Sequence, residues 1–122
     1  MKSVPRQALG RLGESLAAEF LEKLGYSIVE RNFRTPYGEI DLISKQGDVI
    51  IFTEVKTRGS SSLGPPEISI TRKKSEHIRN AAEYYIQQHL DLSDEWRIDV
   101  ISVQMQSKNI PPKIIHFENA IT

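Results

Sequence analysis

Two carboxylates and one lysine stand out in this sequence because they lie at the ends of two predicted strands. Asp41 lies in Gly38-Glu39-Ile40-Asp41-Leu42-Ile43, and Glu54 and Lys56 end the apolar run Val49-Ile50-Ile51-Phe52-Thr53-Glu54-Val55-Lys56. Side chains alternate along a strand, so Glu54 and Lys56 share one face, and a hairpin between the two segments can bring Asp41 to the same side. Charged groups at the end of a buried strand are unfavourable unless they are paired or bind a metal.

Two interpretations account for these charges. In the simpler one, Asp41 forms an ion pair with Lys56 across the hairpin, and strand geometry alone slightly favours it. In the other, Asp41, Glu54 and the carbonyl of Val55 bind Mg²⁺, while Lys56 orients or activates the attacking water. The chain has no cysteine and its three histidines show no metal-ligand spacing, so oxygen ligands are the expected ones.

A second group of charges is basic, although the formal net charge of the chain is zero. If Thr71 caps a helix, its first turn holds three cations, which the helix dipole disfavours. Phosphate is the ligand that such a helix end would bind, whereas a solvated basic face is the alternative. The residues expected to contact a polyanion are Arg58, Arg72, Lys73 and Lys74.

The elements that must position these residues follow from the hydrophobic pattern. Apolar residues spaced three and four apart predict helices from Leu9 to Gly25 and from about Arg72 to Leu90. Strands are expected at residues 26–32, 39–42, 49–56, 97–103 and 113–117, with turns at 35–38 and 45–48 and a loop at 59–66. We therefore expect one α/β domain, residues 1–122, with a central mixed sheet flanked by helices, in which Asp99 pairs with Arg97 or Arg34.

The two charged segments resemble the signature of the PD-(D/E)XK nuclease superfamily, with Asp41 as its acidic residue and Glu54-Val55-Lys56 as its E-x-K. Ile40 replaces the proline that the literal pattern has before the aspartate. The wider pattern resembles an uncharacterised bacterial family, the YraN-like proteins, which are similar to archaeal Holliday-junction resolvases. The match covers nearly the whole chain, from Gly13-Glu14 to Glu118-Asn119-Ala120.

This resemblance implies a restriction-endonuclease-like fold and a nuclease that uses Mg²⁺ or Mn²⁺ to cut DNA, including branched or recombination-intermediate DNA. It also implies that Glu14 lies near the metal, although an acid early in a helix is favourable with the dipole alone. The alternative is a non-catalytic nucleic-acid or protein-binding module on the same scaffold, since a neutral chain steers DNA weakly. With no apolar run near the ~20 residues that span a bilayer, we expect a cytoplasmic protein without a membrane partner, and a homodimer stays open.

Overall fold

The computed structural model describes residues 5–60, 70–91 and 95–122, which contain two helices and five strands. The elements are α1 (Arg6–Lys23), β1 (Ser27–Thr35), β2 (Gly38–Gln46), β3 (Val49–Arg58), α2 (Arg72–Gln88), β4 (Trp96–Gln104) and β5 (Lys113–Ile121). Most of the loop expected at 59–66 lies outside the described residues. None of the described helices is long and apolar enough to cross a membrane.

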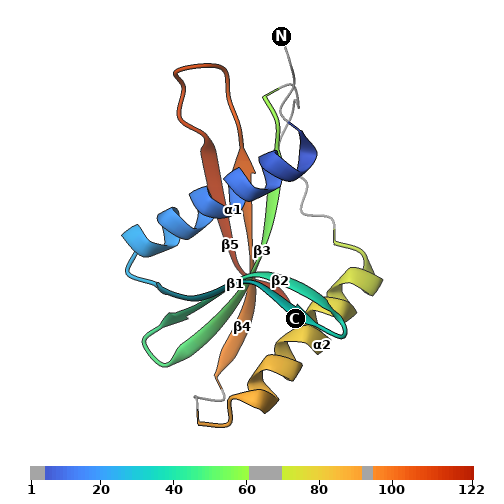
Figure 1. The fold of residues 1–122 in the computed structure, drawn as a ribbon. Coiled ribbons are helices and arrows are strands. Elements are labelled where there is room, and N and C mark those ends of the chain that lie inside the picture. Colours follow the sequence, from blue (N-terminus) through green and yellow to red (C-terminus); the bar gives the residue numbers. More distant parts are fainter. Residues whose placement is uncertain (1–4, 61–69, 92–94) are drawn as a thin grey trace.

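The strands form one mixed sheet in the order β1-β2-β3-β4-β5 (Figure 1). β1, β2 and β3 are antiparallel neighbours, β3 and β4 are parallel, and β5 returns antiparallel to β4. The parallel pair requires a crossover, and the segment that contains α2 provides it. The hairpin between β2 and β3 is confirmed, and Gly47 adopts φ +60° at its turn, where a glycine carries no Cβ penalty.

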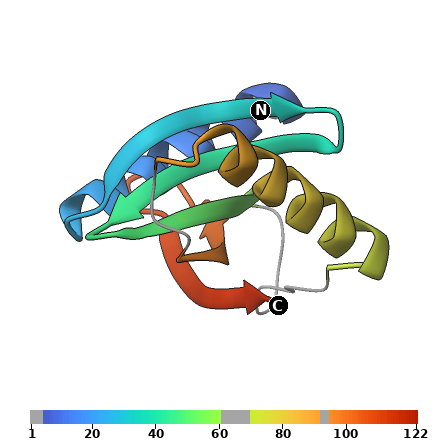
Figure 2. The ribbon, with the colours of Figure 1, turned by 90° about the horizontal axis from the view of Figure 1, so that it is seen from below.

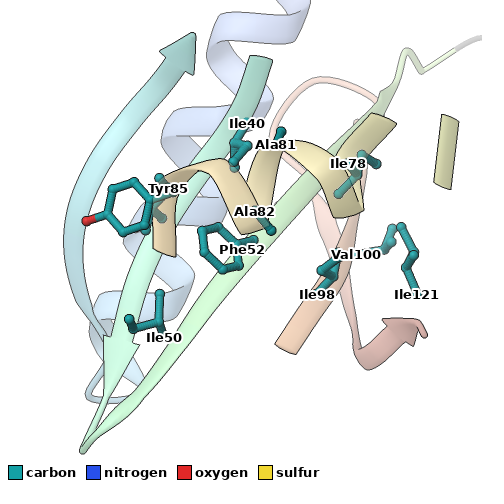
Figure 3. Packing of buried hydrophobic residues seen from close by; sticks show 11 residues of the cluster. Ile40, Ile50, Phe52, Ile78, Ala81, Ala82, Tyr85, Ile98, Val100 and Ile121 are labelled. Atoms are coloured by element: carbon teal, nitrogen blue, oxygen red, sulfur yellow. The ribbon is translucent and has the colours of Figure 1, made fainter. Parts of the chain in front are cut away.

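The two helices cover opposite faces of this sheet, as the view in Figure 2 shows. Successive residues of β3 divide between two clusters: Ile50 and Phe52 pack with α2, whereas Ile51 packs with α1. Figure 3 shows the α2 side, where Phe52 and Tyr85 lie close together at a centroid distance of 5.7 Å. Burial on both faces explains why β3 reads as a continuous apolar run. The predicted fold class, a central mixed sheet flanked by helices, is confirmed and is consistent with a restriction-endonuclease-like core.

Several element ends differ from those predicted. α1 begins at Arg6 rather than Leu9, directly after Pro5, whose fixed φ suits a helix start. β1 continues to Thr35 instead of ending at Asn32, because its ladder with β2 runs to the Thr35 and Gly38 pair at the turn. Much of β1 is polar and exposed, so the hydrophobic pattern misses its far end.

Candidate functional site

The candidate site lies where β2 and β3 stop pairing. Their ladder ends at Leu42 opposite Thr53, while β2 continues back to Gly38 beside β1. Beyond this point Oδ2 of Asp41 accepts a hydrogen bond of 2.8 Å from the backbone N–H of Val55. The Asp41 carboxylate thus takes the place of a strand partner and is held against β3.

A cleft of about 480 Å³ opens beside these strands, with the first turns of α2 as its other wall. Its lining residues are Tyr37, Gly38, Glu39, Asp41, Glu54, Thr71, Lys73, Lys74, His77 and Ile78. The cleft therefore brings together two of the predicted metal ligands and two of the predicted phosphate-binding lysines. Neither Tyr37 nor His77 was a predicted site residue, because no motif marks them and only the packing of α2 places them here.

Asp41 is electrostatically frustrated in this setting. Burial, followed by the negative charge of Glu54, raises the pKa of Asp41 from 3.8 to about 7, and Glu14 and Glu39 add to the effect. The hydrogen bond from Val55 opposes the shift but does not cancel it. Each factor that raises this pKa disfavours the ionised carboxylate, so a nearby positive charge would stabilise it.

Lys74 brings a positive charge into the cleft, where its ammonium group pairs with Glu54. Its Nζ lies 2.8 Å from Oε1 of Glu54, whose side chain is 11% exposed, while the lysine side chain is 49% exposed. The hydrogen bond to Glu54 raises the pKa of Lys74, and the charges of Glu54 and Asp41 raise it further against the effect of burial. Thr71 caps α2 as predicted, because its Oγ1 accepts a 3.1 Å hydrogen bond from the Lys74 N–H.

The predicted ion pair between Asp41 and Lys56 is wrong: in the part of the chain that the structure describes, these two side chains do not pair. Asp41 turns its carboxylate to the Val55 N–H instead. Lys56 lies on the same strand face as Glu54 by alternation, but it is not among the residues that line the cleft. The cation that reaches the carboxylates comes from α2 rather than from β3.

Glu14 reaches the same region from α1 because that helix packs very close to β3. A Cβ on Gly13 would lie 1.8 Å from Oγ1 of Thr57, so only glycine allows this approach. Nδ2 of Asn32 donates to Oε1 of Glu14 at 2.8 Å and to Oε1 of Glu39 at 3.0 Å. Asn32, at φ +51°, thus holds two carboxylates near Asp41, a role that the sequence analysis missed because it depends on contacts between distant segments.

The other predicted basic residues divide into two groups. Lys73 lines the cleft beside Lys74 in the first turn of α2, which contains no acidic residue. Arg72 is exposed in the same turn, and Arg58 ends β3 opposite Gln104 of β4, but neither lines the cleft. A phosphate role for these four residues stays a prediction.

The donors in the cleft fit a hard divalent cation. Within the described ranges, no three side chains of His, Asp or Glu lie close enough together to hold a metal, so two carboxylates must be supplemented. The Val55 carbonyl is available for this, since the N–H and C=O of a strand residue face the same side and this N–H points to Asp41. Mg²⁺ commonly binds through one or two carboxylates and keeps several waters, which suits Asp41, Glu54 and Val55.

A second buried carboxylate, Asp99 of β4, has the opposite environment. It accepts hydrogen bonds from Nε of Arg97 at 2.9 Å, Nε2 of His116 at 2.7 Å and the backbone N–H of Asn119 at 2.8 Å. Burial would raise the pKa of Asp99, but these donors, led by His116, lower it below its ordinary value. The predicted pair with Arg97 is confirmed, and Asp99 does not line the cleft.

Comparison with known proteins adds sequence relatives and one solved structure. The profile of "Uncharacterised protein family UPF0102" matches residues 13–103. UPF0102 proteins of Caldicellulosiruptor saccharolyticus and Geobacter metallireducens are 45% and 42% identical over 104 and 118 residues, which cover 85% and 97% of this chain and 88% and 95% of theirs. The structure of Pyrococcus furiosus SfsA in complex with Ca²⁺ is similar over 89% of this chain and 63% of that one, with 15% identity and a TM-score of 0.41.

Proposed function

This chain belongs to the uncharacterised protein family UPF0102, the YraN-like proteins, and we propose that it is a divalent-metal-dependent endonuclease that acts on DNA. One observation carries the proposal. Asp41 and Glu54 converge in a cleft of about 480 Å³ that is bordered by the basic first turn of α2. A phosphodiesterase site needs carboxylates that can bind a divalent metal and cations that can bind phosphate, and both kinds of residue line this cleft.

The carboxylates have the character that a metal ligand pair needs. The negative charge of Glu54 disfavours the ionised form of Asp41, so a cation between the two carboxylates would remove a repulsion as well as form new contacts. A bound Mg²⁺ or Mn²⁺ supplies Lewis acidity toward a phosphoryl oxygen and activates water for attack at neutral pH. The carbonyl of Val55 would complete the protein's donor set.

The basic residues would place the DNA backbone. Lys73 lines the cleft in the first turn of α2, and both a lysine and the N-terminal end of a helix favour a phosphate oxygen. Arg58 and Arg72 would extend this surface along the DNA beyond the cleft. Lys56, on the same strand face as Glu54, would orient the attacking water, and Glu14, held by Asn32, would assist from the α1 side.

Cleavage assays test the proposal directly. Purified protein with Mg²⁺ or Mn²⁺ should cut at least one DNA in a panel of linear, flapped and four-way substrates, and a preference for the four-way junction would identify branched DNA as the substrate. Glu54→Gln and Asp41→Asn should abolish cutting, whereas Glu83→Gln, a change of an exposed acid on α2, should leave it intact. Cleavage that is unchanged by Glu54→Gln would come from a contaminant and would refute the proposal.

One observation favours the second candidate, a non-catalytic nucleic-acid-binding module. Lys74 already neutralises Glu54, as a cation would in a site that no longer binds metal. In that case calorimetry should detect no Mn²⁺ binding at millimolar concentration, while DNA binding should remain and weaken with salt.

A further inference from the structure

The contact between Lys74 and Glu54 is unusual for a lysine in its position. Lys74 is the third residue after the Thr71 cap of α2, where the helix dipole disfavours a positive charge. Its Nζ nevertheless lies 2.8 Å from a carboxylate oxygen of Glu54, whose side chain is only 11% exposed. The lysine is therefore held by the charge it faces across the cleft and not by its own helix.

The ammonium group of Lys74 lies beside the Glu54 carboxylate, which is where the proposed divalent cation would bind. Among the described residues Lys74 is the basic side chain that pairs with Glu54, and its charge also acts on Asp41. We propose that Lys74 is a resident counter-ion of the Asp41 and Glu54 pair, which leaves Glu54 when a divalent cation binds and then becomes available to a DNA phosphate. This inference rests on the metal site proposed above and describes its regulation.

Electrostatics makes the two cations mutually exclusive. An ammonium 2.8 Å from Glu54 would lie within a few ångströms of a dication bound to the same carboxylate, and like charges at that separation repel strongly in a partly buried site. Lys74 can move away without disturbing α2, because half of its side chain is already exposed and its stem is flexible. Loss of the Lys74 contact is thus a cost that the metal must overcome.

The released lysine would remain where a DNA phosphate could contact it. Lys74 and Lys73 line the same cleft in the first turn of α2, and the N-terminal end of a helix also favours an anion. Metal and DNA should therefore bind cooperatively: the metal frees Lys74 for phosphate, and phosphate draws Lys74 away from Glu54. By linkage the two effects must be equal in free energy.

Titration calorimetry with Mn²⁺ alone tests the exchange without requiring catalysis. Lys74→Gln should bind Mn²⁺ about fivefold more tightly than the wild type, the factor expected when a half-exposed ion pair no longer competes. Lys73→Gln is the matched control, since Lys73 lines the same cleft but does not contact Glu54, and its affinity should change by less than about twofold. Lys74→Arg keeps the charge and should bind Mn²⁺ as the wild type does.

A second measurement uses DNA without metal. Lys74 is then engaged by Glu54, so Lys74→Gln should leave the salt dependence of DNA binding nearly unchanged, whereas Lys73→Gln should lower its slope by about 0.9. Equal Mn²⁺ affinity of Lys74→Gln and wild type, or an equal loss of slope in both variants, would overturn the exchange.

The outcomes separate this inference from the proposed function. If Lys74→Gln binds Mn²⁺ more tightly than the wild type but the wild type cuts no DNA, the exchange of Lys74 for the metal is supported and the proposed endonuclease activity is refuted. If the wild type cuts DNA but Lys74→Gln and the wild type bind Mn²⁺ equally, the endonuclease activity is supported and the exchange is refuted. Mn²⁺ binding by Lys74→Gln alone would support the exchange, and no binding by either protein would refute it.

Discussion

Asp41→Asn should stabilise the metal-free protein at pH 8, although it alters a partly buried residue of the proposed site. The amide oxygen can still accept the hydrogen bond from the Val55 N–H, so the contact with β3 is kept. The negative charge that Glu54, Glu14 and Glu39 oppose is removed. A pKa of about 7 in place of 3.8 corresponds to about 4 kcal/mol of destabilisation by the ionised form, which is the upper limit of the gain.

The pH dependence identifies the cause. Because folding raises the pKa of Asp41, the wild type loses stability as pH rises from about 4 to about 7, and the loss is complete above that range. Asp41→Asn escapes this loss, so its advantage should be largest at pH 8, and more than half should be gone at pH 5. With about 4 °C for each kcal/mol in a chain of this size, the melting temperature at pH 8 should rise by several degrees.

Differential scanning calorimetry at pH 5 and pH 8 measures both effects. Asp48→Asn, at an exposed position in the same hairpin, is the control and should shift the melting temperature little at either pH. Millimolar Mn²⁺ should reverse the order, because binding stabilises the wild type and Asp41→Asn lacks a ligand. A lower melting temperature of Asp41→Asn at pH 8, or a shift that is the same at both pH values, would refute the reasoning.

Two further substitutions test the packing of α1 and the other buried aspartate. Gly13→Ala should destabilise the protein by about 1–3 kcal/mol, because its Cβ would overlap Thr57, whereas Gly10→Ala, with open space around it, should be neutral or stabilising in chemical denaturation. Asp99→Asn should lower the melting temperature at pH 7 by roughly 8–16 °C, the equivalent of about 2–4 kcal/mol, because it leaves Arg97 without its buried carboxylate. That loss should shrink as pH falls below the ordinary carboxylate range, since the folded pKa of Asp99 is lowered; a pH-independent loss would contradict its cause.

The parts of the fold that the sequence predicts correctly are those set by local rules. The apolar run of β3 and the Gly47 turn define the central hairpin, and apolar spacing defines both helices. β5 is predicted only to Phe117 but continues to Ile121, with a shift of register on the way. The polar residues Glu118 and Asn119 lie in this shift, between the pairs that Phe117 and Ile121 form with β4, and no hydrophobic period in the sequence marks such an irregularity.

The site follows the same division. That Asp41 and Glu54 lie together is predictable, because a hairpin register depends on residues close in sequence. The pair of Lys74 and Glu54 cannot be predicted from the sequence, because it depends on how α2 packs against β3. The sequence favours a pair between Asp41 and Lys56 because both are expected on one face of the hairpin. In the structure the β2 and β3 ladder ends at the pair of Leu42 and Thr53, and the backbone N–H of Val55 binds the Asp41 carboxylate.

Asp41 and Asp99 show why we propose a function for one carboxylate of the sheet and not for the other. They lie in one sheet, and Asp99 is in register with Thr53 of β3, next to Glu54. Asp99 has donors from Arg97, His116 and the Asn119 N–H, so the protein itself satisfies its charge. Asp41 has one backbone donor and three carboxylates that act against it, and the lysine of the cleft, Lys74, pairs with Glu54 instead of with Asp41. A strongly perturbed carboxylate in a cleft is a candidate for a functional role, and for Asp41 beside Glu54 the partner that we propose is a divalent cation.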